Sequence, residues 1–211
     1  MVYKTNQKID DELLIIEIIE NGYTNNDFVL FYFSNKIFDD KNKIKKIETK
    51  IAEYRKQKSV CIFAVCKESV LSNDFSFIQN QFDLFFTNIT NQLFDDLINA
   101  CYGTRGMIHG DPADWLPFSK NCKHNILSKE GKSLNEIAKS IINDIKNSYV
   151  IENNAQIENI MCSIQGPAPE DIPTCEIQSF FEELAKEFTD INILWNLYQT
   201  EAANTKVVVV W

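Results

Sequence analysis

Two continuous apolar runs flank a lysine-rich amphipathic stretch, and this arrangement constrains the fold of the 211-residue chain more than any other feature. The first run is Asp27–Phe33 (DFVLFYF) and the second is Val60–Cys66. Short apolar runs of this kind are typical of strands that are buried on both faces of a parallel sheet. Between them, four apolar residues recur at the spacing of a crossover helix: Ile44, Ile47, Ile51 and Tyr54. The sequence therefore predicts a βαβ unit.

Segments on either side extend this first half of the chain. Asp10–Asn21 opens with three acids and continues with apolar residues around most of a helical circumference, which predicts a mostly buried helix ended by Gly22. Phe82–Thr87 (FDLFFT) predicts a third strand. A further helix is expected before Gly103, on the spacing of Leu93, Leu97 and Ile98.

The second half of the chain predicts a two-layer α/β sandwich. Ser133 followed three residues later by Glu136 is a capping box, and the apolar residues after it share one face of a helix. The remaining elements are expected as a strand at Ile157–Ile164, a helix at Cys175–Phe188, and strands at Ile191–Tyr198 and Thr205–Trp211. A polar turn joins the last two strands, which predicts that they pair antiparallel.

Composition and charge narrow the class of protein. A content of 45% hydrophobic and 12% aromatic residues indicates a folded core rather than disorder. Thirty acidic against twenty-one basic residues give a net charge of −9, which repels nucleic acid and anionic lipid, so neither is expected as a partner. The charged N-terminal twenty residues and the short apolar C-terminal run predict no membrane insertion. We expect a cytoplasmic protein.

The six cysteines do not predict a disulfide scaffold or a metal site. Cys61, Cys66 and Cys162 lie in strand-like apolar runs, and no two cysteines form a C-x-x-C pair, which favours buried, reduced and unreactive thiols. Cys122 and His124 form the nearest metal-ligand cluster, but no second pair follows at ligand spacing. We therefore expect no bound metal.

A pair of carboxylates three residues apart, Asp111 and Asp114, is the motif most open to a chemical role. The sequence Asp-Pro-Ala-Asp also suits the start of any helix, with Asp111 as the cap, proline in the first position and an acid in the third. The longer stretch Ile108-His109-Gly110-Asp111-Pro112-Ala113-Asp114 resembles the synergy loop of the FtsZ/tubulin family of polymerising GTPases. That resemblance implies catalytic aspartates that reach the nucleotide pocket of the next subunit and polarise the attacking water. His109 and Pro112 depart from the family pattern.

The expected elements follow the family order along nearly the whole chain. The resemblance implies a partial parallel-sheet GTPase-type domain with the central helix at residues 1–106, and an FtsZ-like α/β sandwich with the synergy loop at 107–211. Ser34–Asp40 stands where the family has a glycine-rich loop whose bare amides cradle the phosphates, and the family's earlier strands and first phosphate loop are missing from this sequence. Asn91 occupies the place of a family residue that contacts guanine, although asparagine at a strand end is also a common turn former.

The resemblance therefore implies a truncated, degenerate FtsZ-like protein that holds no nucleotide cofactor and has no GTPase activity of its own. It would act as a pseudo-GTPase by protein–protein contact on a tubulin- or FtsZ-type filament in cell division or the cytoskeleton. As a cap or regulator of assembly, it would supply Asp111 and Asp114 in trans. One alternative is a self-associating binding module that keeps the fold without a filament role. Another is a divergent active GTPase, which needs phosphate contacts that the sequence does not supply.

Overall fold

The computed structural model describes residues 3–10, 13–19, 28–56, 60–68, 81–102, 106–108, 123–151, 157–166, 168, 172–199 and 204–211. The chain divides into two compact units. The first unit comprises Met1–Phe94 with Asp111–Asn125, and the second comprises Asp95–Gly110 with Ile126–Trp211. The sequence-based domains at 1–106 and 107–211 stay a prediction.

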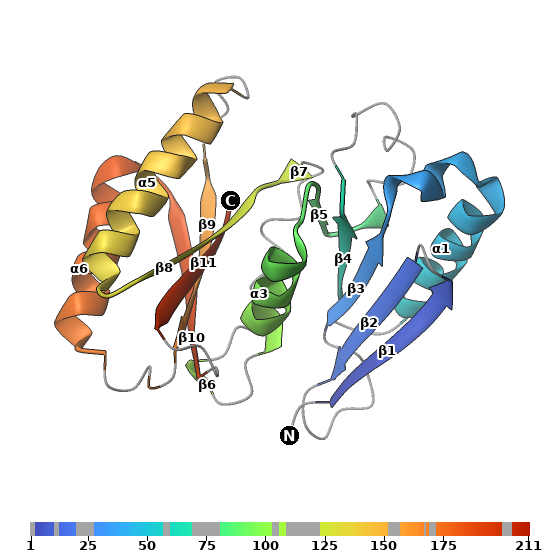
Figure 1. The fold of residues 1–211 in the computed structure, drawn as a ribbon, viewed down its shortest axis with the longest axis horizontal. Helices are drawn as coiled ribbons and strands as arrows, with labels where there is room; N and C mark the ends of the chain where they lie inside the picture. The colour runs from blue at the N-terminus through green and yellow to red at the C-terminus, as the bar shows by residue number, and fades with distance from the viewer. Residues whose placement is uncertain are drawn as a thin grey trace. The chain divides into compact units, whose positions relative to one another are not determined.

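A six-stranded sheet in the order β1-β2-β3-β4-β5-β7 forms the first unit (Figure 1). From β3 onwards neighbouring strands run parallel, whereas β1 and β2 form an antiparallel hairpin that joins β3 antiparallel. The two apolar runs are neighbouring strands joined through helix α1 (Lys41–Tyr54), so the predicted βαβ unit is confirmed. The strands span Tyr3–Asp10 (β1), Leu13–Ile19 (β2), Phe28–Phe33 (β3), Cys61–Cys66 (β4), Leu84–Phe86 (β5) and Lys123–His124 (β7).

The helix predicted for Asp10–Asn21 is wrong, because this stretch contains the end of β1 and all of β2. Ile15 and Ile16 pair with Phe31 and Leu30 of β3 in a regular register. A short apolar run does not distinguish a buried helix from a buried strand by periodicity, and its isoleucines are β-branched, which favours the strand. Pairing with β1 and β3 therefore decides the conformation.

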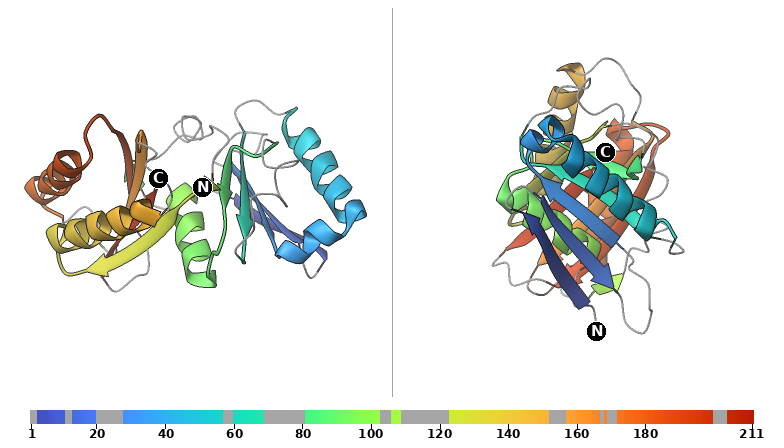
Figure 2. Two further views of the ribbon diagram at one scale, coloured as in Figure 1. Left: turned by 90° about the horizontal axis from the view of Figure 1, so that it is seen from above. Right: turned by 90° about the vertical axis from the view of Figure 1, so that its right-hand side faces the viewer.

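Helix α1 lies on one face of this sheet (Figure 2). It packs there through Ile47, Ile51 and Tyr54, which are buried in one cluster with side chains of β2, β3 and β4. The Tyr54 hydroxyl donates a hydrogen bond of 2.5 Å to the Glu17 carboxylate on β2. Burial and this hydrogen bond raise the pKa of Tyr54 well above its ordinary value. The contact joins the helix to the hairpin.

The second unit contains a five-stranded sheet in the order β6-β10-β9-β11-β8, with helices α5 (Leu134–Ile151) and α6 (Thr174–Glu187) on one face (Figure 1). The predicted sandwich and both helices are confirmed, and the Glu136 amide donates to the Ser133 hydroxyl at 3.3 Å, as a cap requires. Among the described helices, none has the length and apolar character needed to cross a membrane. The strands span Gly106–Ile108 (β6), Ile126–Gly131 (β8), Asn159–Gly166 (β9), Asn192–Gln199 (β10) and Thr205–Val210 (β11).

The predicted antiparallel pair of the last two strands is wrong. Strand β9 lies between them, and pairs parallel with β10 and antiparallel with β11. A short connection favours neighbouring strands, but β9 is buried along almost its whole length and takes a partner on each edge. The other edge of β11 is paired with β8, a strand that the sequence analysis missed because its ILSKEG sequence is neither continuously apolar nor regularly alternating.

Helix α3 (Asn91–Tyr102) confirms the helix predicted before Gly103, and the boundary between the two units falls within it, after Phe94. In the second unit, its residues contact the sheet through polar groups. The Gln165 amide donates to the Asp96 carbonyl at 3.3 Å, and the Asn196 amide donates to the Ala100 carbonyl at 3.0 Å. Both side chains are buried.

The cysteine pattern predicts selective thiol labelling. Cys61, Cys66 and Cys162 are free and buried within strands, as expected, whereas Cys175 is exposed. Burial raises the pKa of the Cys66 thiol to about 12, so the reactive thiolate is scarce at neutral pH. We expect a maleimide reagent to modify Cys175 in the folded protein and to reach the three strand cysteines only after denaturation, as measured by peptide mass mapping. Equal rates at all four positions would contradict the burial.

Candidate functional site

The carboxyl ends of β3, β4 and β5 lie along one edge of the first unit's parallel sheet, the edge at which α/β folds bind ligands. Ser34 follows β3, Lys67 and Glu68 follow β4, and Thr87 follows β5. We call this group of segments the strand-end site. If the chain held a nucleotide as the family does, the segment after β3 would have to present free amides to its phosphates.

The segment after β3 is a short 3-10 helix, η1 (Asn35–Asp39), rather than an open glycine loop. The Asn35 amide donates to one oxygen of the Glu68 carboxylate at 2.9 Å, and the Ser34 hydroxyl donates to the other at 3.2 Å. Ser34 in turn accepts from the Lys36 amide at 3.4 Å. The Glu68 carboxylate therefore already accepts the hydrogen bond from the Asn35 amide, which a bound phosphate would need.

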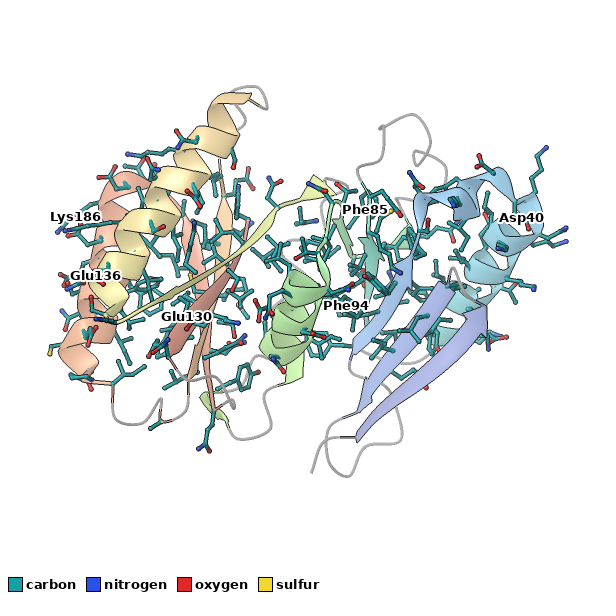
Figure 3. All side chains as sticks on the ribbon, viewed as in Figure 1. Asp40, Phe85, Phe94, Glu130, Glu136 and Lys186 are labelled. Atoms are coloured by element: carbon teal, nitrogen blue, oxygen red, sulfur yellow. The ribbon has the colours of Figure 1, made fainter. Side chains whose placement is uncertain are left out.

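Asp40 caps the N-terminus of α1, so its side chain occupies the free amides there (Figure 3). Its carboxylate accepts from the Asn42 amide at 2.9 Å and from the Lys43 amide at 3.4 Å. Unoccupied helix N-termini attract anions through these amides. With Asp40 and Glu68 in place, both amide sites carry a negative charge of their own and repel a triphosphate.

Asn91 begins α3 and is engaged with β3. The Tyr32 hydroxyl donates to its side-chain oxygen at 3.1 Å, and the Tyr32 ring stacks on Phe94 with centroids 4.0 Å apart and an interplanar angle of 15°. Lys67 Nζ lies 4.8 Å from the centroid of the Tyr32 ring, a cation–π contact. The oxygen of Asn91 thus has a structural partner, which favours the turn and packing role over a guanine contact.

One polar group of the strand-end site has no partner. Thr87 Oγ1 is buried and forms no hydrogen bond in the described structure. A neutral hydroxyl neither balances the charge of phosphates nor holds a metal by itself. In the described ranges, no group of three or more histidine, cysteine or acidic side chains is placed to bind a metal ion.

The sequence prediction located some of this site and missed its central group. Ser34–Asp40 was expected to lack a phosphate cradle, and the structure adds that Glu68 lies against it. An acid two residues beyond the end of a parallel strand is the sequence signal that would have pointed to Glu68. Asp111 and Asp114 lie outside the described residues, so their role stays a prediction.

Comparison with known proteins bears on the fold. No protein-family model and no curated protein matches the sequence. Solved structures do match. CetZ1 from Haloferax volcanii, a GDP-bound monomer, has a TM-score of 0.57 at 9% identity, and the match covers 88% of this chain and 64% of that chain. CetZ from Methanosaeta thermophila strain DSM 6194 has a TM-score of 0.56 at 13% identity, with 61% of that chain covered by 89% of this one. CetZ2 from Haloferax volcanii, a GTPγS-bound protofilament, has a TM-score of 0.56 at 7% identity, with 65% of it covered by 89% of this chain.

These matches establish the fold class. The chain has the mixed α/β fold of FtsZ/tubulin-like proteins, which confirms the fold implied by the sequence resemblance. The three structures to which it is similar here are CetZ proteins. The chain spans less than two thirds of the length of each, and identities of 13% or less carry the fold alone.

Proposed function

We propose that this protein is an FtsZ-like pseudo-GTPase that acts by protein–protein contact on a tubulin- or FtsZ-type filament, as a cap or a regulator of assembly. The observation that carries the proposal is the Glu68 carboxylate bound to the Asn35 amide, where a nucleotide phosphate would be needed. A fold kept without its phosphate contacts retains surfaces for assembly partners. A subunit of this kind docks on a filament end and offers the next subunit no nucleotide.

Direct titration tests the nucleotide part of the proposal. We expect no saturable binding of a fluorescent GTP analogue at concentrations at which a complete FtsZ-like protein, measured as the positive control, is saturated. The reason is that Glu68 and Asp40 occupy the amides and repel the phosphates. Micromolar affinity would contradict the pseudo-GTPase proposal and favour the divergent active GTPase.

Mixing the protein with a complete, GTP-hydrolysing FtsZ-like subunit tests the action in trans. We expect the wild-type protein to change the partner's GTP turnover, and the Asp111→Asn/Asp114→Asn variant to bind the partner without that change. Asparagine caps a helix about as well as aspartate but is not a charged base, so the variant separates catalysis from capping. The expected loss of stimulation is about a hundredfold, the lower end of the usual contribution of a general base. Equal effects of both proteins would make the two carboxylates structural.

Self-association is the second candidate function, because one structural neighbour is itself a protofilament. Sedimentation of the protein alone distinguishes the two. Concentration-dependent assembly without any effect on the filaments or turnover of an FtsZ-like partner would favour a self-associating module over a filament regulator.

A further inference from the structure

An open groove runs along the solvent side of α1 in the first unit. It has a volume of about 550 Å³, and the buried Leu13 of β2 is its one lining residue outside α1. The α1 residues that line it are spaced three and four apart, so they form one stripe of the helix: Asn42, Lys45, Lys46, Thr49 and Lys50. Lysine stems are apolar along most of their length, so the groove combines an apolar lining with cationic tips.

The charge of this stripe is opposite to that of the protein. Residues 41–56 carry seven basic and two acidic side chains, in a chain of net charge −9. Lys50 pairs with Glu53 at 2.9 Å. Lys45 and Lys46 are exposed and form no ion pair in the part of the chain that the structure describes. Both ammonium groups therefore lie beside the groove without an ion pair among the described residues.

We propose that this α1 groove binds a short acidic peptide segment of a partner protein, with one apolar side chain against the lysine stems and carboxylates on Lys45 and Lys46. From Asn42 to Lys50 the helix rises about 12 Å. An extended peptide advances about 3.3 Å per residue, so about four residues fill the stripe. This site is separate from the strand-end site and does not depend on the proposed function.

The charge distribution favours a short peptide over nucleic acid or a lipid surface. Fields in physiological salt decay over about 8 Å. A segment of four residues therefore experiences mainly the local lysines. A duplex or a bilayer extends far beyond that distance and meets the acidic remainder of the protein, which repels it.

Fluorescence anisotropy with a labelled peptide of sequence Glu-Glu-Leu-Glu tests the site on the full chain. We expect saturable binding that weakens as salt is raised, and that weakens about fivefold in the Lys45→Gln/Lys46→Gln variant, since an exposed charged contact contributes a factor of roughly two to five in affinity and two such contacts are lost. The matched control is Lys132→Gln/Lys139→Gln, which removes the same charge from exposed positions of the second unit and should bind as the wild type does. Circular dichroism confirms that both variants are folded.

Three outcomes overturn the proposal. The first is equal binding by the Lys45→Gln/Lys46→Gln variant and the control variant, which would make the attraction nonspecific. The second is equal binding of Gln-Gln-Leu-Gln, which would remove the acidic requirement. The third is tighter binding of a DNA duplex or of phosphatidylserine vesicles than of the peptide. Loss of GTP-linked activity on a filament has no bearing on these results, so the two proposals fail separately.

Discussion

Replacing Phe31 by alanine is expected to lower the free energy of unfolding of the first unit by about 4 kcal/mol. Phe31 is fully buried in β3. Its ring makes edge contacts with Tyr54 of α1 and with Phe82, at centroid distances of 6.1 and 5.6 Å. Truncation removes apolar contacts on the strand that joins the hairpin to the parallel sheet and leaves a cavity under α1. About 4 kcal/mol is a large part of the 5 to 15 kcal/mol that stabilises an ordinary domain.

Denaturant unfolding measures the loss of stability, and hydrogen exchange of the native protein locates it. Exchange should rise most in peptides from β3 and β4, because these strands share the cluster that contains Phe31. Phe31→Leu is the matched control and should cost about a third as much, since it keeps most of the apolar volume. A change below 1 kcal/mol for Phe31→Ala would mean that the cluster does not hold this sheet together.

The parallel part of the fold was predictable because the pattern of apolar residues in its elements indicates which of them are buried. Val29 and Ile62 lie in runs with no polar interruption, and only a strand covered on both faces accommodates such a run. Ile47 and Ile51 repeat at helical spacing among lysines, so the crossover helix could also be assigned. In these elements local pattern and tertiary environment agree.

The hairpin and the strand order were not predictable by the same reasoning. Ile15 and Ile16 fit a buried helix as well as a buried strand, and only their pairing with β3 resolves the difference. Short connections suggest neighbours, but Cys162 of β9 pairs with Trp195 on one side and Val209 on the other. Strand order depends on contacts between distant segments, which no local window contains.

In the strand-end site, too, some features follow from the local sequence and others from contacts between distant segments. The lack of glycine in Ser34–Asp40 and the acid after β4 can both be seen in the sequence, but only the pairing of the strands shows that this acid reaches the Asn35 amide. Glu68 is 33 residues away from Asn35 along the chain and reaches it because β3 and β4 are parallel neighbours. The strand pairing therefore brings the Glu68 carboxylate to the segment after β3, where it accepts the hydrogen bonds of Ser34 and Asn35.

Lys206→Met is expected to lower the free energy of unfolding of the second unit by about 3 kcal/mol, because it removes an ammonium group that pairs with a buried carboxylate. Lys206 of β11 contacts Asp96 of α3 at 2.8 Å, and the Asp96 side chain is only 2% exposed. The Gln165 amide meets the Asp96 carbonyl beside this pair, so the charge lies in the polar contact between helix and sheet. Urea unfolding in a Trp115→Phe background, monitored by the fluorescence of Trp195 and Trp211, both in the second unit, measures the loss.

A double-mutant cycle separates the ion pair from simple packing at the same place. The Asp96→Leu/Lys206→Met variant removes both charges and should recover most of the loss, since an apolar pair of similar volume often replaces a buried ion pair without penalty. Lys129→Met, at an ion pair with Asp144 in which both side chains are about a third exposed, is the surface control and should cost less than 1 kcal/mol. If Lys206→Met costs no more than Lys129→Met, the buried charge does not stabilise the contact between α3 and the sheet. If the double variant is less stable than Lys206→Met, packing rather than charge dominates there.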